Sequence, residues 1–539
     1  MMMHRNRSVE PHRFAMVPKA EIPRSSFTSQ MTHKTTFDAG FLIPFYADEV
    51  LPGDTFNVKA TLFARLATPI TPVMDNLHLE TFFFFVPNRI VWTNWVKLMG
   101  EQTNPGDSIS FLTPVLTSAA GGFPVGSIYD YFGLPTVGQV GGANTVTVSA
   151  MWLRAYNDIY NEWFRDENLV NSATINTGDG PDAVANYALR RRGKRHDYFT
   201  SCLPFVQKGP AVTAPLAGSA TIRSDGSQII MRGGTGAAVF MTAATGASGS
   251  SPTFQSATSA GNLNWGAANV GVAGMFADLS TATGATINAL RQSFQIQKLL
   301  ERDARGGTRY TEIVRAHFGV ISPDARLQRP EYLGGGSTPI IVNPIAQTAG
   351  TGATGTTTPL GNLAAMGTSL ASGHGFTQSF TEHGMIIGLV NVRADLTYQQ
   401  GLRKMWSRRT RYDYYFPAFA MLGEQSVLNK EIFADGSAND DLVFGYQERW
   451  AEYRYHPSMI TGLFRSTSAG TIDIWHLAQR FTVLPTLNQT FIEETPPLSR
   501  VLAVGAAANG QQIIMDSFIE IKAARPLPMY SVPGLIDHF

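Results

Sequence analysis

The sequence predicts a mainly β protein, an antiparallel β sandwich with long loop insertions and a few α-helices. Three observations predict this fold class. Apolar and polar residues alternate with a period of two in several segments, and glycine and proline interrupt the chain between them. No helix alternates regularly with strands, which disfavours a parallel α/β sheet. With 44% apolar residues, the 539-residue chain can fill the core of such a sandwich.

Two strands are expected near the N-terminus. Residues 56–66 alternate between an apolar and a polar face, which is typical of a half-buried strand. Residues 77–86 form a second strand, and its end at 82–85 is apolar on both faces. Both faces of that strand must therefore be covered, either by a second sheet or by another subunit.

Helical spacing of apolar residues predicts two helices in the middle of the chain. One covers residues 152–164, where an aromatic-rich stripe lies opposite a charged face and is expected to pack across a sheet. The other begins near Thr286 and ends at Gly306 and Gly307. After this glycine pair, residues 310–318 alternate and predict a strand.

The strand pattern returns towards the C-terminus. Alternating or continuous apolar runs separated by glycine and proline predict four more strands. Their expected ranges are 385–396, 442–455, 471–477 and 512–523.

The N-terminal residues 1–36 are expected to form an extended basic arm. This segment holds six basic and two acidic residues, and three prolines oppose regular structure. Arg5, Arg7 and Arg13 are candidate contacts to nucleic acid or to a neighbouring subunit, and a solvated tail is the alternative.

The remaining residues, 37–539, are expected to form one domain with two low-complexity insertions. The first, at about 210–285, is rich in Gly, Ala, Ser and Thr, and scattered aromatic residues within it suggest short strands. The second, at about 334–381, has no charged residue. Both are expected to extend loops of the sandwich.

Composition limits the classes of function. Only 15% of residues are charged, which indicates that neighbouring molecules cover much of the surface. The formal net charge of +1 is too small for the chain to neutralise a packed genome alone. The single Cys202 rules out an internal disulfide and is expected to be a buried structural thiol. The absence of a secretory signal or long apolar run predicts a soluble intracellular product.

The sequence does not predict an enzyme or a required cofactor. No arrangement of nucleophile, base and orienting group is evident around Cys202, and the histidines lack zinc-ligand spacing. Asn176, Asp179 and Asp182 lie among glycines and provide oxygen ligands of the kind that calcium prefers. They do not match the EF-hand pattern, so bound calcium is left open.

Two basic clusters are the candidate sites. The first comprises Arg190, Arg191, Arg192, Lys194 and Arg195; the second comprises Arg403, Lys404, Trp406, Arg408, Arg409 and Arg411. The second leads into several tyrosines, and cations with aromatic faces suit sequence-independent binding of single-stranded DNA. The alternatives are salt bridges between subunits, with acidic residues at 440–441 and 493–494, or solvated faces. An intersubunit role is favoured for the first cluster.

Long phrases of the sequence resemble one protein family. The phrases, in order, are EVLPGDTF (49–56), FFVPNRIVW (84–92), AYNDIYNEWFRD (155–166), RHDYFTSCLP (195–204), ERDARGGTRY (301–310), DARLQRPEYLGG (324–335), YQQGLRKMW (398–406), FGYQERWAEYRY (444–455) and YSVPGLIDHF (530–539). Together they resemble the major capsid proteins of gokushoviruses, a branch of the microviruses, which are small single-stranded-DNA bacteriophages. The similarity is collinear along the chain and weakest in the two low-complexity insertions.

The resemblance implies a viral β jelly roll and a structural role in the virion. It implies self-assembly through pentamers into a T=1 icosahedral shell around circular single-stranded DNA, in the host cytoplasm. Expected partners are a small basic DNA-binding viral protein, possible scaffolding protein and a host surface receptor. The insertion at about 210–285 is expected to form a threefold protrusion used in host attachment. The alternative hypothesis is a trimeric receptor-binding spike or fibre protein of a phage.

Overall fold

A computed structural model describes residues 23–213, 287–320, 328–348, 361–503 and 511–530, together with the backbone of five short strands between 221 and 278. The chain divides into two compact units. One contains residues 1–206 and 304–539, and the other contains residues 207–303. Each unit is described by itself.

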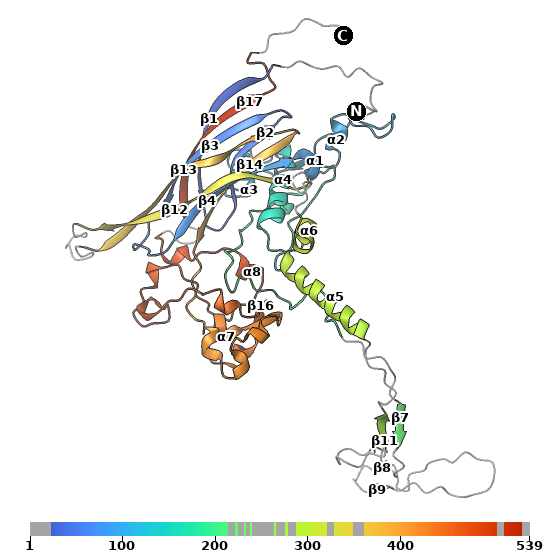
Figure 1. Ribbon diagram of the computed structural model, residues 1–539. Helices are drawn as coiled ribbons and strands as arrows, with labels where there is room; N and C mark the ends of the chain where they lie inside the picture. The colour runs from blue at the N-terminus through green and yellow to red at the C-terminus, as the bar shows by residue number, and fades with distance from the viewer. Residues whose placement is uncertain are drawn as a thin grey trace, which may run out of the picture. The chain divides into compact units, whose positions relative to one another are not determined.

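The larger unit is built on one eight-stranded antiparallel sheet (Figure 1). The order of its strands is β1-β17-β3-β13-β12-β4-β14-β2. The bounds are β1 Ser25–Phe37, β2 Ile43–Val50, β3 Thr55–Leu66, β4 Leu77–Pro87, β12 Glu331–Ala346, β13 Leu363–Ser379, β14 Gly384–Ala394 and β17 Ile513–Arg525.

Strand β12 joins two four-stranded halves of this sheet. Its residues 331–340 pair with β4, and its residues 341–346 pair with β13. The two edge strands approach each other, since the Nδ1 atom of His33 on β1 lies 3.1 Å from the carbonyl oxygen of Phe45 on β2. The sheet is thus nearly closed, and the predicted jelly-roll architecture is confirmed.

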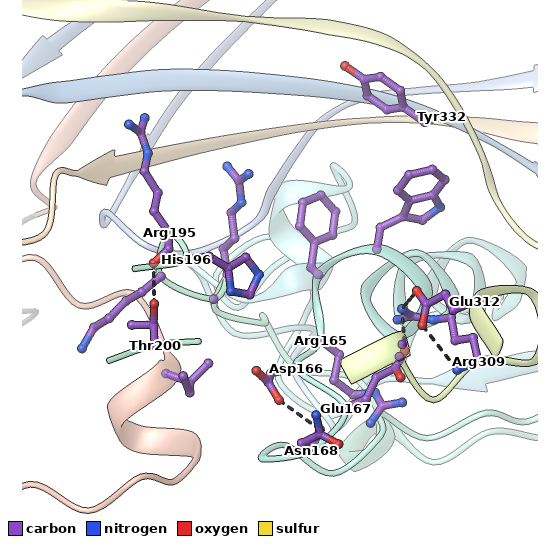
Figure 2. Close-up of a pocket in the computed structure, with 18 of the residues that line it drawn as sticks. Arg165, Asp166, Glu167, Asn168, Arg195, His196, Thr200, Arg309, Glu312 and Tyr332 are labelled. Atoms are coloured by element: carbon purple, nitrogen blue, oxygen red, sulfur yellow. Dashed lines mark hydrogen bonds and ion pairs between the residues drawn. The ribbon is translucent and has the colours of Figure 1, made fainter. Parts of the chain in front are cut away.

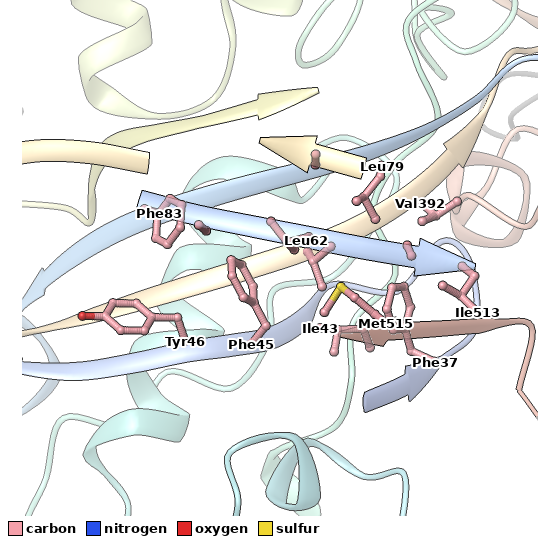
Figure 3. Close-up of a cluster of buried hydrophobic side chains, with 14 of the residues drawn as sticks. Phe37, Ile43, Phe45, Tyr46, Leu62, Leu79, Phe83, Val392, Ile513 and Met515 are labelled. Atoms are coloured by element: carbon pink, nitrogen blue, oxygen red, sulfur yellow. The ribbon is translucent and has the colours of Figure 1, made fainter. Parts of the chain in front are cut away.

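The main core lies between the two halves of the sheet (Figure 3). The apolar face of β3 points into it, and Phe83 packs edge-to-face against Phe45 at 5.5 Å between ring centroids. Ile513 and Met515 of β17 complete it from the C-terminal strand. Burying each large apolar side chain contributes about 1.5–3 kcal/mol. The strands predicted at 56–66, 77–86, 385–396 and 512–523 are confirmed as β3, β4, β14 and β17.

A helical layer covers the other face of β4. Helix α4, Met151–Ile159, continues as a π-helical turn, Tyr160–Phe164, which confirms the predicted helix. Phe84 packs with Tyr156 and Trp92 in a second buried cluster, while Phe83 and Phe85 belong to the main core. The run 82–85 is apolar on both faces because the second half of the sheet covers one face and the α4 layer covers the other.

Short elements fill the connections. They are α1 Asn88–Val91, α2 Trp95–Leu98, β5 Val115–Thr117, α3 Ile128–Tyr131, β6 Thr147–Ser149, β15 Glu424–Leu428, α7 Asn429–Ile432, β16 Val443–Glu448 and α8 Gln489–Ile492. Cys202 lies in a third buried cluster, where its Sγ atom donates to the carbonyl oxygen of Tyr198 at 3.4 Å. Burial raises the pKa of this thiol, which confirms its expected structural role.

The strand predicted at 310–318 is wrong. Helix α5 covers Ile287–Gly306 as expected, but Tyr310–Phe318 forms a second helix, α6. Its first turn is capped where the backbone N–H of Arg309 reaches the Glu312 carboxylate at 3.4 Å. Gly319 ends it with a left-handed φ of 70°. These local caps outweigh a period-two pattern that was too short to decide between helix and strand.

Three further boundaries differ from the sequence prediction. Most of the expected insertion at 334–381 lies in β12 and β13 of the main sheet, and residues 349–360 lie outside the described residues. The strand expected at 471–477 is a loop with a 3-10 turn at Asp473–Trp475. The expected arm ends earlier, because Ser25–Phe37 forms edge strand β1 and pairs with β17 along its whole length.

The described part of the smaller unit contains five short strands. β7 Thr221–Ser224 pairs with β11 Met275–Asp278, and β8 Met231–Arg232 pairs with both β9 Ala238–Val239 and β10 Asn264–Trp265. Short strands were expected in this low-complexity tract. Among the helices in the described part of the chain, none is long and apolar enough to span a membrane.

Candidate functional site

The first basic cluster lies in an extended segment inside the larger unit. Backbone hydrogen bonds join this segment to residues 40–42 on one side, through the Arg190 carbonyl and Leu42 N–H at 2.9 Å. On the other side, the Lys194 N–H donates to the Ile492 carbonyl at 2.8 Å. The segment 190–195 is therefore held between two distant parts of the chain.

Glu80 on β4 gathers three arginines. Its carboxylate contacts Arg192 directly, lies 3.2 Å from Nη2 of Arg195 and lies 3.0 Å from Nη2 of Arg393 on β14. Glu80 is 7% exposed. Burial opposes its ionisation, but the guanidiniums of Arg192 and Arg393 outweigh burial and hold the Glu80 pKa below its usual value. Burial lowers the pKa of Arg192 to about 10, so this arginine stays charged at neutral pH.

Aromatic rings hold the other cations of the first cluster. The guanidinium of Arg191 lies 3.9 Å from the Phe41 ring centroid, and that of Arg190 lies 5.6 Å from the Tyr160 centroid. Lys194 lies 4.6 Å from the Phe491 centroid. The carboxylates that form salt bridges with this cluster, Glu80 and Asp395, belong to the same chain. The acidic run at 493–494 also meets the cluster within the chain, because Arg191 donates to the Glu494 carbonyl at 3.1 Å. The cluster braces the subunit from within.

A cavity of about 1100 Å³ lies beside this cluster (Figure 2). Its aromatic lining residues are Phe82, Phe84, Trp163, Phe164 and Tyr332, and its basic ones are Arg165, Arg192, Lys194, Arg195, Arg305, Arg309, Arg315 and Arg393. Three carboxylates, Asp166, Glu167 and Glu312, also line it. Figure 2 shows Arg309 beside Glu312, where an ion pair of 3.0 Å forms. The cavity combines an excess of positive charge with aromatic surface.

The second basic cluster divides into paired and free cations. Three of its members are bound within the chain. Lys404 lies 3.2 Å from the Glu431 carboxylate, Arg408 lies 2.9 Å from that of Glu452, and Arg403 lies 3.3 Å from Nδ1 of His456. These three residues hold the loop 403–411 on the body of the subunit.

The outer members form an exposed surface that we call the aromatic–basic surface. It comprises Trp406, Arg409, Arg411, Tyr412, Tyr414 and Tyr415. Trp406 is 70% exposed and Tyr412 is 69% exposed, which is unusual for large aromatic side chains. Neither Arg409 nor Arg411 forms an ion pair within the part of the chain that the structure describes, and the guanidinium of Arg411 lies 5.3 Å from the Phe416 ring centroid. The surface therefore offers free positive charge next to accessible aromatic faces.

Trp450 packs against Tyr415 and so helps to position the aromatic–basic surface. Its φ of 71° is in the left-handed region, which costs a residue other than glycine about 1–3 kcal/mol. Its indole N–H donates to the Phe419 carbonyl at 2.9 Å, and its ring packs edge-to-face against Tyr415 at 5.5 Å. Sequence reasoning missed this role, because a single tryptophan in a strand-like run gives no sign of its backbone conformation.

The residues considered for calcium are engaged by protein donors. Both carboxylate oxygens of Asp182 accept from Arg154, at 2.7 and 2.8 Å, and Tyr187 donates to the same carboxylate. Asp179 accepts from the Trp92 indole at 2.8 Å. The guanidinium of Arg154 thus supplies the positive charge beside Asp182, and calcium binding stays a prediction.

The arm residues Arg5, Arg7 and Arg13 lie outside the described residues. The first described cation of that segment is Arg24. Its guanidinium donates to the Gly53 carbonyl at 2.6 Å, so the chain is fixed to the sheet at this point.

A nearly closed eight-stranded jelly roll with long loops and large exposed apolar and aromatic side chains is typical of viral shell subunits. Comparison with known proteins agrees with this class. The chain matches the family described as capsid protein (F protein) over residues 15–535. It is 47% identical to the capsid protein VP1 of Bdellovibrio phage phiMH2K and 42% identical to that of Chlamydia phage 1, with 98% of each chain covered. It is 37% identical to the capsid protein VP1 of Spiroplasma virus 4, with 97% of each covered.

The chain therefore belongs to the phage capsid protein (F protein) family. It is a structural major capsid protein, a component of the virion that self-assembles into a shell, and it is not an enzyme. The predicted resemblance to capsid proteins of microviruses is confirmed.

Proposed function

We propose that this capsid protein forms a T=1 icosahedral shell around a circular single-stranded DNA genome, and that the aromatic–basic surface contacts the DNA. One observation supports the DNA contact: exposed Trp406 and Tyr412 lie in the same loop as Arg409 and Arg411, which form no ion pair among the described residues. Stacking on an exposed ring contributes about 1–3 kcal/mol per base and does not depend on sequence. Free arginines beside the rings attract the phosphates.

The cavity beside the first basic cluster is a second candidate contact for the genome. Arg192, Lys194 and Arg195 line it, although Glu80 and Asp395 balance part of their charge. The remaining excess of cations favours an anionic group, and the aromatic walls favour a base. We rank this contact below the aromatic–basic surface because its cations are already engaged.

Two further roles belong to the same proposal. The net charge of +1 leaves most of a packed genome to be neutralised by another molecule, so we propose that a small basic DNA-binding viral protein accompanies the shell. The resemblance to gokushoviruses implies a threefold protrusion at the insertion of about 210–285, and we propose that this insertion attaches the particle to a host receptor. A scaffolding protein remains a proposed partner in assembly.

The DNA contact predicts a defined loss in the double variant Arg409→Ala/Arg411→Ala. Binding of a labelled oligo(dT) strand should weaken, and the slope of log affinity against log salt should fall by about 1.4, because each removed phosphate contact changes the slope by about 0.7. Trp406→Ala should weaken binding with an unchanged slope, since stacking carries no charge.

A matched control is available on the exposed face of α5. The variant Lys298→Ala/Arg302→Ala removes the same charge at two exposed cations and should leave both affinity and slope unchanged. Equal losses in the two double variants would indicate a nonspecific effect of net charge and would contradict the proposed contact. Arg408 is unsuitable for the test because it is paired with Glu452 inside the subunit.

A further inference from the structure

We propose that a pocket walled by the loop 403–411 takes up one base of a single DNA strand and favours guanine. The pocket has a volume of about 200 Å³ and lies within the larger unit. The inference rests on the proposed DNA contact of the aromatic–basic surface. It adds a preference among the four bases, which stacking on exposed rings does not supply.

The loop 403–411 joins the pocket to the aromatic–basic surface. Residues that line the pocket and residues of that surface alternate along the loop. The pocket is lined by Arg403, Lys404, Met405 and Arg408, and the surface includes Trp406, Arg409 and Arg411. A strand that stacks on the surface therefore passes beside the pocket, where one base can turn out of the strand and enter.

The walls of the pocket suit a flat aromatic ligand. The buried part of the lining includes the rings of Tyr198, Phe199 and Tyr398, none of which is more than 5% exposed. The outer part includes Tyr453 and Tyr455, which are 49% and 47% exposed. Proteins hold an unstacked base between aromatic and apolar side chains and recognise its edge with a few polar groups.

The two carboxylates of the lining are already engaged within the chain. The Glu431 carboxylate lies 3.2 Å from Nζ of Lys404 and accepts from the Tyr198 hydroxyl at 2.8 Å. The Glu452 carboxylate accepts from Arg408 at 2.9 Å. These side chains therefore leave little acceptor capacity for a ligand.

The polar groups of the lining that remain available are donors. Arg403 and Arg465 form no ion pair among the described residues, and Arg465 spends one N–H on the Gln399 carbonyl at 3.1 Å. Arg403 lies 3.3 Å from Nδ1 of His456. Because arginine can only donate, this Nδ1 accepts, and the neutral imidazole carries its proton on Nε2. His456 thus adds a third donor.

A pocket of donors selects guanine among the four bases. Guanine presents two neighbouring acceptors, O6 and N7, which one guanidinium can bind with two hydrogen bonds. Adenine and cytosine present an amino group, which would face the donors of the protein, and thymine presents one acceptor beside a methyl group. The lining holds four arginine and lysine side chains against two carboxylates, so its net positive charge also favours the phosphate of the same nucleotide.

The first test compares strands that differ in one base. Labelled oligo(dT) strands with a single central dG, dA or dC are titrated with the purified full-length chain. The dG strand should bind about tenfold more tightly than the dA and dC strands, equivalent to about 1.4 kcal/mol. Equal affinities for the three strands would overturn the proposal.

A charge-preserving variant identifies the group that recognises the base. Arg403→Lys keeps the positive charge but cannot form the paired hydrogen bonds of a guanidinium, so the ratio of the dG to the dA affinity should fall close to one. Arg454→Lys is the matched control and should keep the ratio, because Arg454 is outside the lining and pairs with Glu448 at 2.6 Å. A ratio that survives Arg403→Lys, or that both variants lose equally, would overturn the proposal.

Ultraviolet cross-linking locates the base without a mutation. The guanine of the dG strand should attach to Tyr453 or Tyr455, as mapped by mass spectrometry, and cross-links confined to Trp406 and Tyr412 would overturn the pocket. Calorimetry with dGMP separates this inference from the proposed DNA contact. A chain that binds dGMP but no oligo(dT) would contradict the DNA contact and support the pocket. Strands bound equally whatever their central base would leave the DNA contact standing and overturn the pocket.

Discussion

At the scale of the residue, one buried carboxylate organises the charges inside the subunit. Glu80 is the one acidic residue of strand β4, and Arg192, Arg195 and Arg393 reach it from two other segments. Removing one partner of a buried ion pair leaves the other charges without compensation in a region of low polarity. Glu80 thus ties the segment 190–195 to both β4 and β14.

Glu80→Gln should lower the free energy of unfolding by about 3–5 kcal/mol, because Arg192 and Arg393 would face a neutral amide. The Glu80 pKa lies below 4.5 in the folded protein, so its stabilisation is complete above that pH and is lost as pH falls through the folded value. The difference between the unchanged protein and the variant should therefore be largest at neutral pH and should shrink below about pH 4.5. Urea unfolding followed by fluorescence at several pH values measures both effects.

Asp441→Asn is the control for this prediction. Asp441 pairs with Lys430 at 2.6 Å, but its side chain is 78% exposed, so water screens the pair. Its loss should cost less than about 1 kcal/mol. Equal costs for the two variants would show that Glu80 does not hold the cluster together.

Residue-level prediction from the sequence was partly successful. The two basic clusters were found because cations are visible in a sequence, but the division between paired and free cations was not. Arg408 and Arg409 are neighbours in the chain, and only the fold shows that Arg408 meets Glu452 while Arg409 faces solvent. A single acidic residue in the apolar run of β4 was the available signal for the Glu80 network.

At the scale of the element, β12 shows why a glycine run can belong to a sheet. The run Gly334 to Gly336 lies in the part of β12 that pairs with β4, next to a register shift between Tyr332 and Gly334, and its backbone approaches other strands closely. A Cβ atom at Gly335 would lie 2.0 Å from the Thr81 carbonyl oxygen, and one at Gly336 would lie 2.5 Å from the His374 ring. Glycine is needed in this run because a side chain at Gly335 would collide with the Thr81 backbone and one at Gly336 with the His374 ring.

Gly335→Ala should therefore destabilise the subunit by about 3 kcal/mol or more, because the colliding atom belongs to the backbone and cannot rotate away. Thermal unfolding of the purified protein measures this loss. Gly106→Ala is the control, since a Cβ atom there meets nothing within 4 Å. Unchanged stability of Gly335→Ala would show that β12 and β4 are not packed as closely as described.

The elements that the sequence predicted correctly have long patterns. Strand β3 alternates over its whole length and the α4 stripe spans several turns, so period alone identifies both. Strands β12 and β13 were taken for an insertion because Gly, Ala, Ser and Thr give little contrast between faces. Helix α6 was missed because its caps, at Arg309 and Gly319, depend on local contacts that the spacing of apolar residues in the sequence does not reveal.

At the scale of the whole molecule, the subunit is nearly neutral, but its charged and apolar side chains lie on different surfaces. The net charge of +1 arises from 42 basic and 41 acidic residues, and the ion pairs around Glu80 and Glu431 use many of them inside the chain. What remains outside is an aromatic–basic surface and a largely apolar sheet face on β3, β13 and β17, where Phe63, Leu370 and Ile514 are exposed. Assembly covers apolar surface many times over in a symmetric shell, so individually weak contacts add to a stable particle.

Electron microscopy of the chain expressed alone, together with the mass of its particles in solution, tests the central claim that this subunit builds a T=1 shell by self-association. The account predicts closed T=1 shells or pentamers that complete such shells when single-stranded DNA and a basic partner are added. A well-folded protein that stays monomeric at high concentration, with the apolar face of β3, β13 and β17 exposed to water, would contradict it.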